Sequence, residues 1–92
     1  MALSGQKTVT VAGTAVALGS TQVSAPLMIK ALDTNTGKIY IGNDGSGDVD
    51  SSNGLVLLAN ELVLFDWVGN LASIIIDASV GGEGVAWLLL DA

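Results

Sequence analysis

The sequence predicts a small all-β domain, an antiparallel β-sandwich or barrel of about eight short strands with a jelly-roll-like arrangement. Short apolar stretches recur along the chain, and clusters of Gly, Asn, Asp and Ser separate them. A repeat of about ten residues with such turn signals is typical of all-β sandwiches and barrels. With 92 residues the chain has room for one hydrophobic core, so we expect residues 1–92 to form a single domain.

The first four strands follow from alternating or β-branched apolar stretches. Pro26 suits the start of the third strand, where its missing N–H costs little. The segment 33–37 predicts a turn, because Asn35 and Gly37 tolerate positive φ angles. Residues 1–7 precede the first strand as a possible N-terminal arm. The four strands are expected at Thr8–Val11, Ala15–Leu18, Leu27–Leu32 and Lys38–Gly42.

The second half begins with Asn43–Gly54, a polar stretch without strand or helix pattern that predicts a flexible acidic loop. A turn is expected at Trp67–Asn70. A helix over Gly54–Phe65 is the alternative in this region, because Leu, Ala and Glu favour helices, but its apolar residues leave no polar face. The remaining strands are expected at Leu55–Leu58, Leu62–Asp66, Ser73–Ser79 and Val85–Leu90.

The charge balance and the missing residue types exclude several classes of function. Nine acidic residues face three basic ones, a net charge of -6, so the chain has few cations for a nucleic acid or an anionic membrane. The absence of Cys and His excludes thiol, disulfide and imidazole chemistry. The apolar runs are shorter than a spanning helix, and the first residues lack the pattern of a signal peptide. We expect no nucleic-acid partner and no membrane partner.

The apolar content instead predicts contacts between chains. Hydrophobic residues make up 50% of the chain and charged residues 13%, against about 25% charged in an average domain. The stretches Ile74–Ile76 and Ala86–Leu90 are apolar on both strand faces, and a sandwich covers only one face. A neighbouring subunit is expected to cover the second face in a homo-oligomer, with a trimer favoured; the alternative is an outer face that tolerates Leu and Ile. The expected interface residues are Met1, Leu3, Trp67, Ile75, Trp87 and Leu89.

The acidic loop contains the one candidate metal site. Asp44, Asp48 and Asp50 supply oxygen ligands of the kind that calcium binds. The EF-hand pattern fails here, because Val49 or Leu55 occupies the position of its turn glycine. We interpret the loop as an exposed acidic turn and expect no cofactor.

Catalysis has little support in the residue types present. The serines lack a histidine partner, and the carboxylates lack the aromatic platforms on which glycosidases hold sugars, since aromatic residues are only 4% of the chain. The sequence predicts a protein that is not an enzyme, with no catalytic residue.

Several turn and strand signatures resemble a known family. They are Asn35–Gly42, Ser51–Gly54, Ile76–Ser79 and Gly82–Val85. Together these stretches resemble small all-β virion structural proteins of tailed bacteriophages, over about Val23–Leu88. The chain departs from them at Leu58–Glu61, where a glycine-centred turn would be expected. The resemblance implies a structural role, as a capsid decoration (cement) protein or a head or tail accessory protein, and supplies no catalytic residue.

These observations lead to one functional expectation and two alternatives. We expect a capsid decoration protein that bridges capsid subunits, with itself and the major capsid protein or another virion protein as partners. Its place would be the virion, after assembly in the host cytoplasm, where the lack of cysteine suits reducing conditions. The alternatives are a tail or fibre accessory component, and a receptor- or carbohydrate-binding β-sandwich module on the virion.

Overall fold

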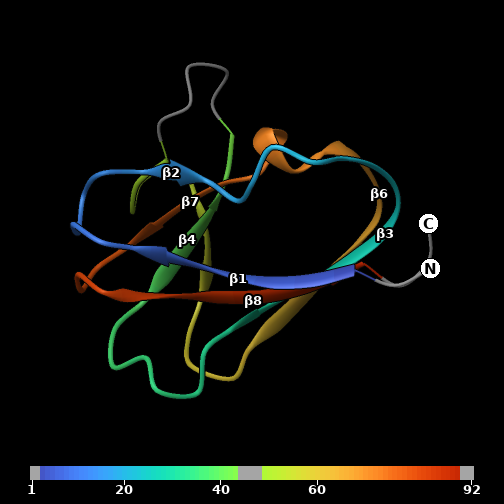
Figure 1. Cartoon of the computed structure of the whole chain (residues 1–92). Helices are drawn as coiled ribbons and strands as arrows, with labels where there is room; N and C mark the ends of the chain where they lie inside the picture. The colour runs from blue at the N-terminus through green and yellow to red at the C-terminus, as the bar shows by residue number, and fades with distance from the viewer. Residues whose placement is uncertain (1–2, 44–48, 90–92) are drawn as a thin grey trace.

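The chain folds as an antiparallel β-sandwich in the computed structural model, which describes residues 3–43 and 49–89. Two four-stranded sheets pack face to face, which confirms the predicted all-β class (Figure 1). A single turn of 3₁₀ helix, η1 (Leu71–Ser73), joins two of the strands. No helix within these ranges is long and apolar enough to span a membrane. The strands are β1 (Leu3–Val9), β2 (Val16–Ala17), β3 (Gln22–Ala31), β4 (Ile39–Gly42), β5 (Leu55–Leu57), β6 (Leu62–Asn70), β7 (Ile75–Ala78) and β8 (Glu83–Leu89).

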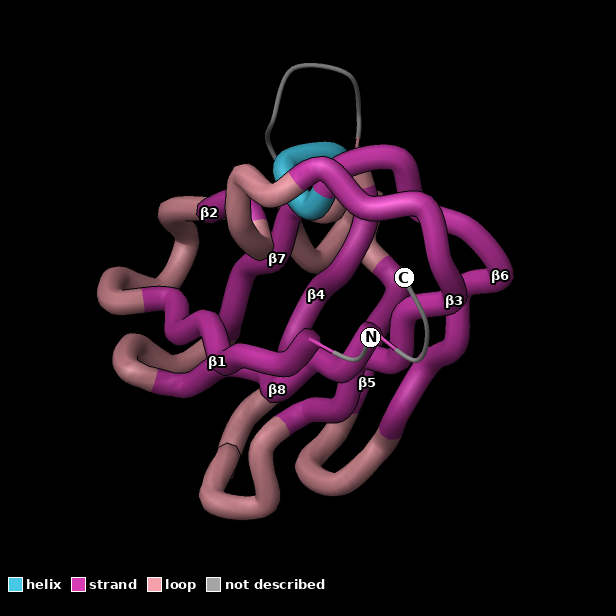
Figure 2. The backbone as a smooth tube through the Cα atoms, turned by 45° about the vertical axis from the view of Figure 1, so that its right-hand side comes forward, coloured by secondary structure: helices cyan, strands magenta, loops and turns pink. Residues whose placement is uncertain are grey.

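The strand order is that of a jelly roll. Sheet A has the order β1-β8-β3-β6 and sheet B the order β2-β7-β4-β5. Strands therefore pair as β1 with β8, β2 with β7, β3 with β6 and β4 with β5, like one long hairpin folded over into two layers (Figure 2). This arrangement of antiparallel strands in two Greek keys defines the jelly roll.

The core lies between the two sheets and follows from the period-2 alternation of the strands. In β3, Leu27, Ile29 and Ala31 are fully buried, whereas Met28 is half-buried and Lys30 is exposed on the outer face. Alternate residues of a strand point to opposite faces, so one face of β3 supplies the core and the other meets solvent. The other buried core residues are Val9, Leu18, Ile39, Ile41, Leu57, Leu71, Ile76, Ala78, Val85 and Leu89.

Strands β3 and β6 extend well beyond their predicted ranges. β3 begins at Gln22, and its pairing with β6 shifts register on either side of Ala25, next to Pro26. A bulge at this point tolerates the missing N–H of a proline inside a strand. The predicted turn at Trp67–Asn70 is wrong, because these residues continue β6 up to the start of η1.

The described residues of the predicted N-terminal arm do not form a separate arm. Leu3–Lys7, which we expected ahead of the first strand, belong to β1 and pair with β8. Gly5 lies opposite Trp87, and a Cβ atom on Gly5 would come within 2.8 Å of the indole Cζ2 atom. A glycine at this position leaves room for the half-buried ring, which packs against the core.

The chain itself covers the second apolar face of β7. Ile76 is fully buried in the core, and Ile75 on the opposite face is only 6% exposed. Gly42 pairs with Ile75, and a Cβ atom there would lie 3.9 Å from the Val49 side chain, so Val49 lies over this outer face. Val49 is itself 1% exposed. The structure thus corrects the expectation that a neighbouring subunit must cover Ile75.

Two of the sequence motifs meet in a hydrogen-bonded clamp between the β3–β4 turn and the start of β8. The Asn35 side chain is buried and donates to the Gly84 carbonyl oxygen (2.9 Å), and the Gly84 N–H donates back to it (3.3 Å). Beside it, the Glu83 carboxylate accepts hydrogen bonds from the N–H groups of Thr36 (2.6 Å) and Gly37 (2.9 Å). Because these bonds favour the charged form, the pKa of Glu83 lies below its ordinary value.

We expect the Glu83 clamp to make stability depend on pH in the acid range. A lowered pKa in the folded state means that ionised Glu83 stabilises the fold. This contribution is fully present above the ordinary value of 4.5 and is lost as the pH falls through the lowered folded value. Melting temperatures measured from pH 7 to pH 3 should show wild type and Glu83→Gln differing most at neutral pH and converging in acid. Asp33→Asn, at an exposed position of the same turn, should keep the wild-type profile; a constant gap for Glu83→Gln would contradict the prediction.

Candidate assembly surface

Most of the exposed apolar side chains lie on the edge strands β5 and β6, on the turn between them, and on the outer face of sheet A. Among the described residues, eight large hydrophobic side chains are exposed. Two of them, Val11 and Val80, lie in the turns that follow β1 and β7. The other six lie on β5, the β5–β6 turn, β6 and the outer face of β8. These six residues, the apolar margin, are Leu55, Val56, Leu58, Leu62, Leu64 and Leu88.

The outer face of sheet A carries Leu88 from β8, and also Leu62 and Leu64, because β6 is apolar at every position from Leu62 to Phe65. Val63 and Phe65 are half-buried and pack against the core, so their neighbours Leu62 and Leu64 point outward and are 50% and 54% exposed. The register continues this apolar surface across the sheet, from Leu64 to Met28 and from Met28 to Leu88. A contiguous exposed apolar patch of this kind marks a surface for protein contacts.

The four sheet edges differ in how well they are protected. β2 and β5 are only two and three residues long. β1 is a seven-residue edge with polar residues at Ser4, Gln6, Lys7 and Thr8. β6 is nine residues long, contains neither lysine nor proline, and has its one charged residue at Asp66, beside a register shift in its pairing with β3. Short edges, charges, bulges and prolines prevent unwanted strand pairing, so the segment Leu62–Phe65 of β6 is the least protected edge.

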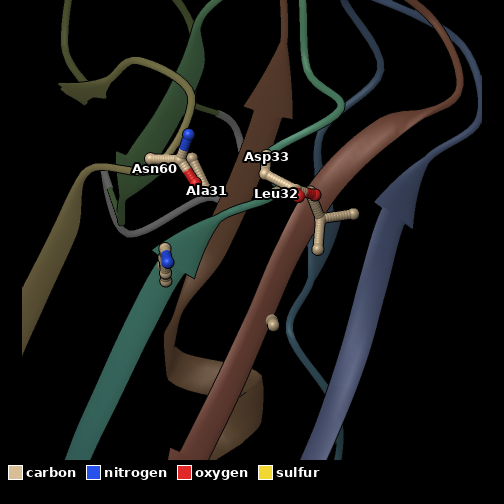
Figure 3. Close-up of a pocket in the computed structure, with 6 residues that line it drawn as sticks. Ala31, Leu32, Asp33 and Asn60 are labelled. Atoms are coloured by element: carbon tan, nitrogen blue, oxygen red, sulfur yellow. The ribbon is translucent and has the colours of Figure 1, made fainter.

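A shallow pocket lies beside this margin, at the end of β3. Its volume is about 210 Å³. Figure 3 shows Asn60 next to Ala31, with Asp33 farther along the β3–β4 turn. The side chains of Lys30, Asp33 and Asn60 contribute an ammonium group, a carboxylate and an amide to its lining, but no aromatic ring lines the pocket. The lining residues are Lys30, Ala31, Leu32, Asp33, Asn60 and Ala86.

Comparison with known proteins identifies no relative of this chain. The chain matches no protein-family model, and no curated protein or solved structure is significantly similar to it. The resemblance to phage virion proteins therefore stays a prediction, and the function is inferred from the fold and the surface.

The predicted interface residues have mixed outcomes. Leu89 is 1% exposed within the chain itself, so like Ile75 it belongs to the interior and not to a free surface. Trp87 is half-buried at the margin of the core. Met1 and the side chains of Leu3 and Trp67 lie outside what the structure describes.

The sequence prediction missed the apolar margin. The available signal was the run Leu62–Phe65, which is apolar at odd and even positions alike. Such a run implies a second apolar face in the same way as the two stretches that were singled out. Because adjacent residues of a strand alternate between faces, the run implies that two of its side chains point away from the core, without showing which two or whether the chain covers them.

The candidate metal ligands do not assemble in the described part of the chain. Asp44 and Asp48 lie outside it. The Asp50 carboxylate accepts hydrogen bonds from the N–H and the hydroxyl of Ser52, at 2.8 and 2.6 Å, and so caps its own turn. Among described residues, no group of three acidic side chains is placed to hold a metal ion.

Proposed function

We propose that the chain is a non-enzymatic structural protein of a bacteriophage virion, a capsid decoration protein that binds at junctions between capsid subunits. The observation that carries this proposal is the apolar margin, where six exposed large hydrophobic side chains gather on an otherwise acidic domain. Cohesion between subunits is a function that such a surface can perform without catalytic groups. The turn and strand signatures shared with virion proteins support the same conclusion.

The physical basis of attachment would be apolar and main-chain contact. Lys7, Lys30 and Lys38 are the only cations in the sequence, so ion pairs to an acidic capsid face would be few. Exposed ion pairs contribute about 0–1 kcal/mol each and weaken with salt. Burial of apolar surface contributes roughly 25 cal/mol per Å² and is not screened. The apolar margin therefore suits a long-lived contact.

The jelly roll is compatible with this role and with its main rival. Viral capsid proteins and lectins both use this fold, so the fold alone does not choose between them. The pocket at Lys30, Asp33 and Asn60 is the feature that could bind a polar ligand. Its lining lacks an aromatic ring on which a sugar could stack. A receptor- or carbohydrate-binding module is therefore the second candidate.

Binding of the purified protein to virions assembled without it tests the proposal. We expect the protein to bind and to stay bound in about 1 M salt, where the Debye length is about 3 Å. Leu55→Asp, on the apolar margin, should prevent binding, whereas Thr8→Asp on β1 adds the same charge at an exposed polar position and should not. Failure to bind, or release by salt alone, would contradict the proposal.

A further inference from the structure

We propose that two copies of this chain pair through β6, edge to edge and antiparallel, with Val63 of each copy on the two-fold axis. The pairing would join the two copies of sheet A into one continuous eight-stranded sheet. This inference stands on the geometry of β6 and does not depend on the proposed virion function. It also replaces the trimer favoured by the sequence with a two-fold dimer.

The main chain of β6 is arranged to accept another strand. The Ala31 N–H donates to the Glu61 carbonyl oxygen (2.9 Å), so Glu61 faces β3. In an antiparallel pair successive residues face alternate sides, and Val63 therefore also faces β3. The main-chain polar groups of Leu62 and Leu64 face the open edge of the sheet. These are the groups to which an added strand hydrogen-bonds.

The side chains of β6 fit against those of a second copy that is related to the first by a two-fold axis. With Val63 on the axis, Leu62 of one copy lies opposite Leu64 of the other, and the reverse pair forms by symmetry. Both leucines are about half exposed in the single chain and point to the same outer face. Met28, which pairs with Leu64, would extend the joined apolar surface on each side. Directly opposed apolar side chains are the unit of sheet stabilisation.

The charges on β6 favour an axis at Val63 over an axis at Leu64 or at Phe65. With Val63 on the axis, Glu61 lies opposite Phe65 and Asp66 lies opposite Asn60, so no carboxylate faces another carboxylate or a leucine. An axis at Leu64 would place Asp66 opposite Leu62, and an axis at Phe65 would place it opposite Leu64. Both shifts lose the Leu62–Leu64 pairs and set Asp66 against a leucine, which costs desolvation. With Val63 on the axis, the carboxylate opposite an apolar residue is that of Glu61, and it accepts a hydrogen bond from the Leu58 N–H (2.7 Å) within its own turn.

The surface of the chain is large enough for a dimer of ordinary size. A stable dimer buries about 800 Å² on each partner. The chain exposes 4850 Å², so such an interface would cover about one sixth of its surface. A two-fold contact uses the same patch on both copies, here Leu62 and Leu64 of the apolar margin. Leu55, on β5 of the other sheet, lies outside this pairing.

The mass of the full chain in solution, measured by analytical ultracentrifugation at micromolar concentration, tests the dimer. We expect twice the chain mass of 9.2 kDa. Leu64→Lys should raise the dissociation constant at least about a hundredfold, because each dimer loses two leucine contacts and gains two ammonium groups at the axis. Ser4→Lys is the matched control, since Ser4 is exposed on the polar edge of the same sheet. Circular dichroism confirms that each variant is folded.

A cysteine introduced at the axis tests the register independently. The chain has no cysteine of its own. Opposed residues of a non-hydrogen-bonded antiparallel pair have Cβ atoms about 4.5 Å apart, close enough for a disulfide. Val63→Cys should therefore form a disulfide-linked dimer on mild oxidation, and Leu64→Cys should not. A monomer, a trimer, a dimer unaffected by Leu64→Lys, or cross-linking at position 64 and not 63 would each overturn the proposal.

Discussion

Replacing Leu89 with Asp is expected to abolish cooperative unfolding at neutral pH, because the protein would no longer fold. Leu89 is 1% exposed and belongs to the core between the sheets. An unpaired carboxylate at such a position costs several kcal/mol. Domains of this size have only about 5–15 kcal/mol of stability in total, so one buried charge removes most of it. Thermal melts followed by circular dichroism measure the effect.

The neighbouring residue provides the matched control for Leu89→Asp. Leu88 lies on the same strand, but it is 37% exposed and points to the outer face. Leu88→Asp should keep a cooperative transition and lose no more than about 1 kcal/mol of stability. Equal damage from both substitutions would contradict the assignment of inner and outer faces on β8.

Removing the Asn35 side chain is expected to have the second largest effect. Its amide satisfies both the N–H and the carbonyl oxygen of Gly84, at 3.3 and 2.9 Å, and both residues are buried. Asn35→Ala leaves the buried Gly84 N–H without the Asn35 side chain, whereas the Gly84 carbonyl oxygen keeps the hydrogen bond from the Leu32 N–H (3.1 Å). One buried polar group without its partner costs about 1–3 kcal/mol, so the free energy of unfolding should fall by about that amount in urea denaturation.

An exposed residue of the same turn distinguishes this clamp from a general effect of the turn. Thr34 is exposed, so Thr34→Ala should change stability by no more than about 0.5 kcal/mol. If Asn35→Ala were equally mild, the two hydrogen bonds to Gly84 would not stabilise the fold. An Asn35→Ala variant that unfolds at the same urea concentration as wild type would contradict the stabilising role of the clamp.

The clamp also shows how far the motifs could be understood from the sequence. Asn35 was expected to favour a turn through its backbone angles, and Glu83 belongs to Gly82–Val85, one of the stretches that carry the family resemblance. In the structure both bind across the β3–β4 turn and β8, nearly fifty residues apart, and Asn35 is buried. A partner at that separation is brought close only by the packing of the sheets, so no local pattern could predict it.

The sequence indicated that the chain has an apolar surface for contacts with other chains, but it did not indicate which residues form that surface. The apolar excess predicted contacts with other chains, and that remains a proposal. Two of the six residues predicted for the contact, Ile75 and Leu89, are buried. Leu62 and Leu64 are exposed instead, because Val49 lies over the outer face at Ile75, while nothing in the described chain covers Leu62 and Leu64.

By itself the sequence determined the strand content and most strand positions, because hydrophobic alternation within a strand and the turn residues on either side of it are local features of the sequence. It determined the acidic charge and the lack of thiol and imidazole chemistry, since these are counts of residues. Only the tertiary structure decided strand order, the joining of Trp67–Asn70 to β6, and which of two apolar faces is solvent-exposed. Those features depend on contacts between segments distant in the chain, and their energy comes from burial that no single segment achieves alone.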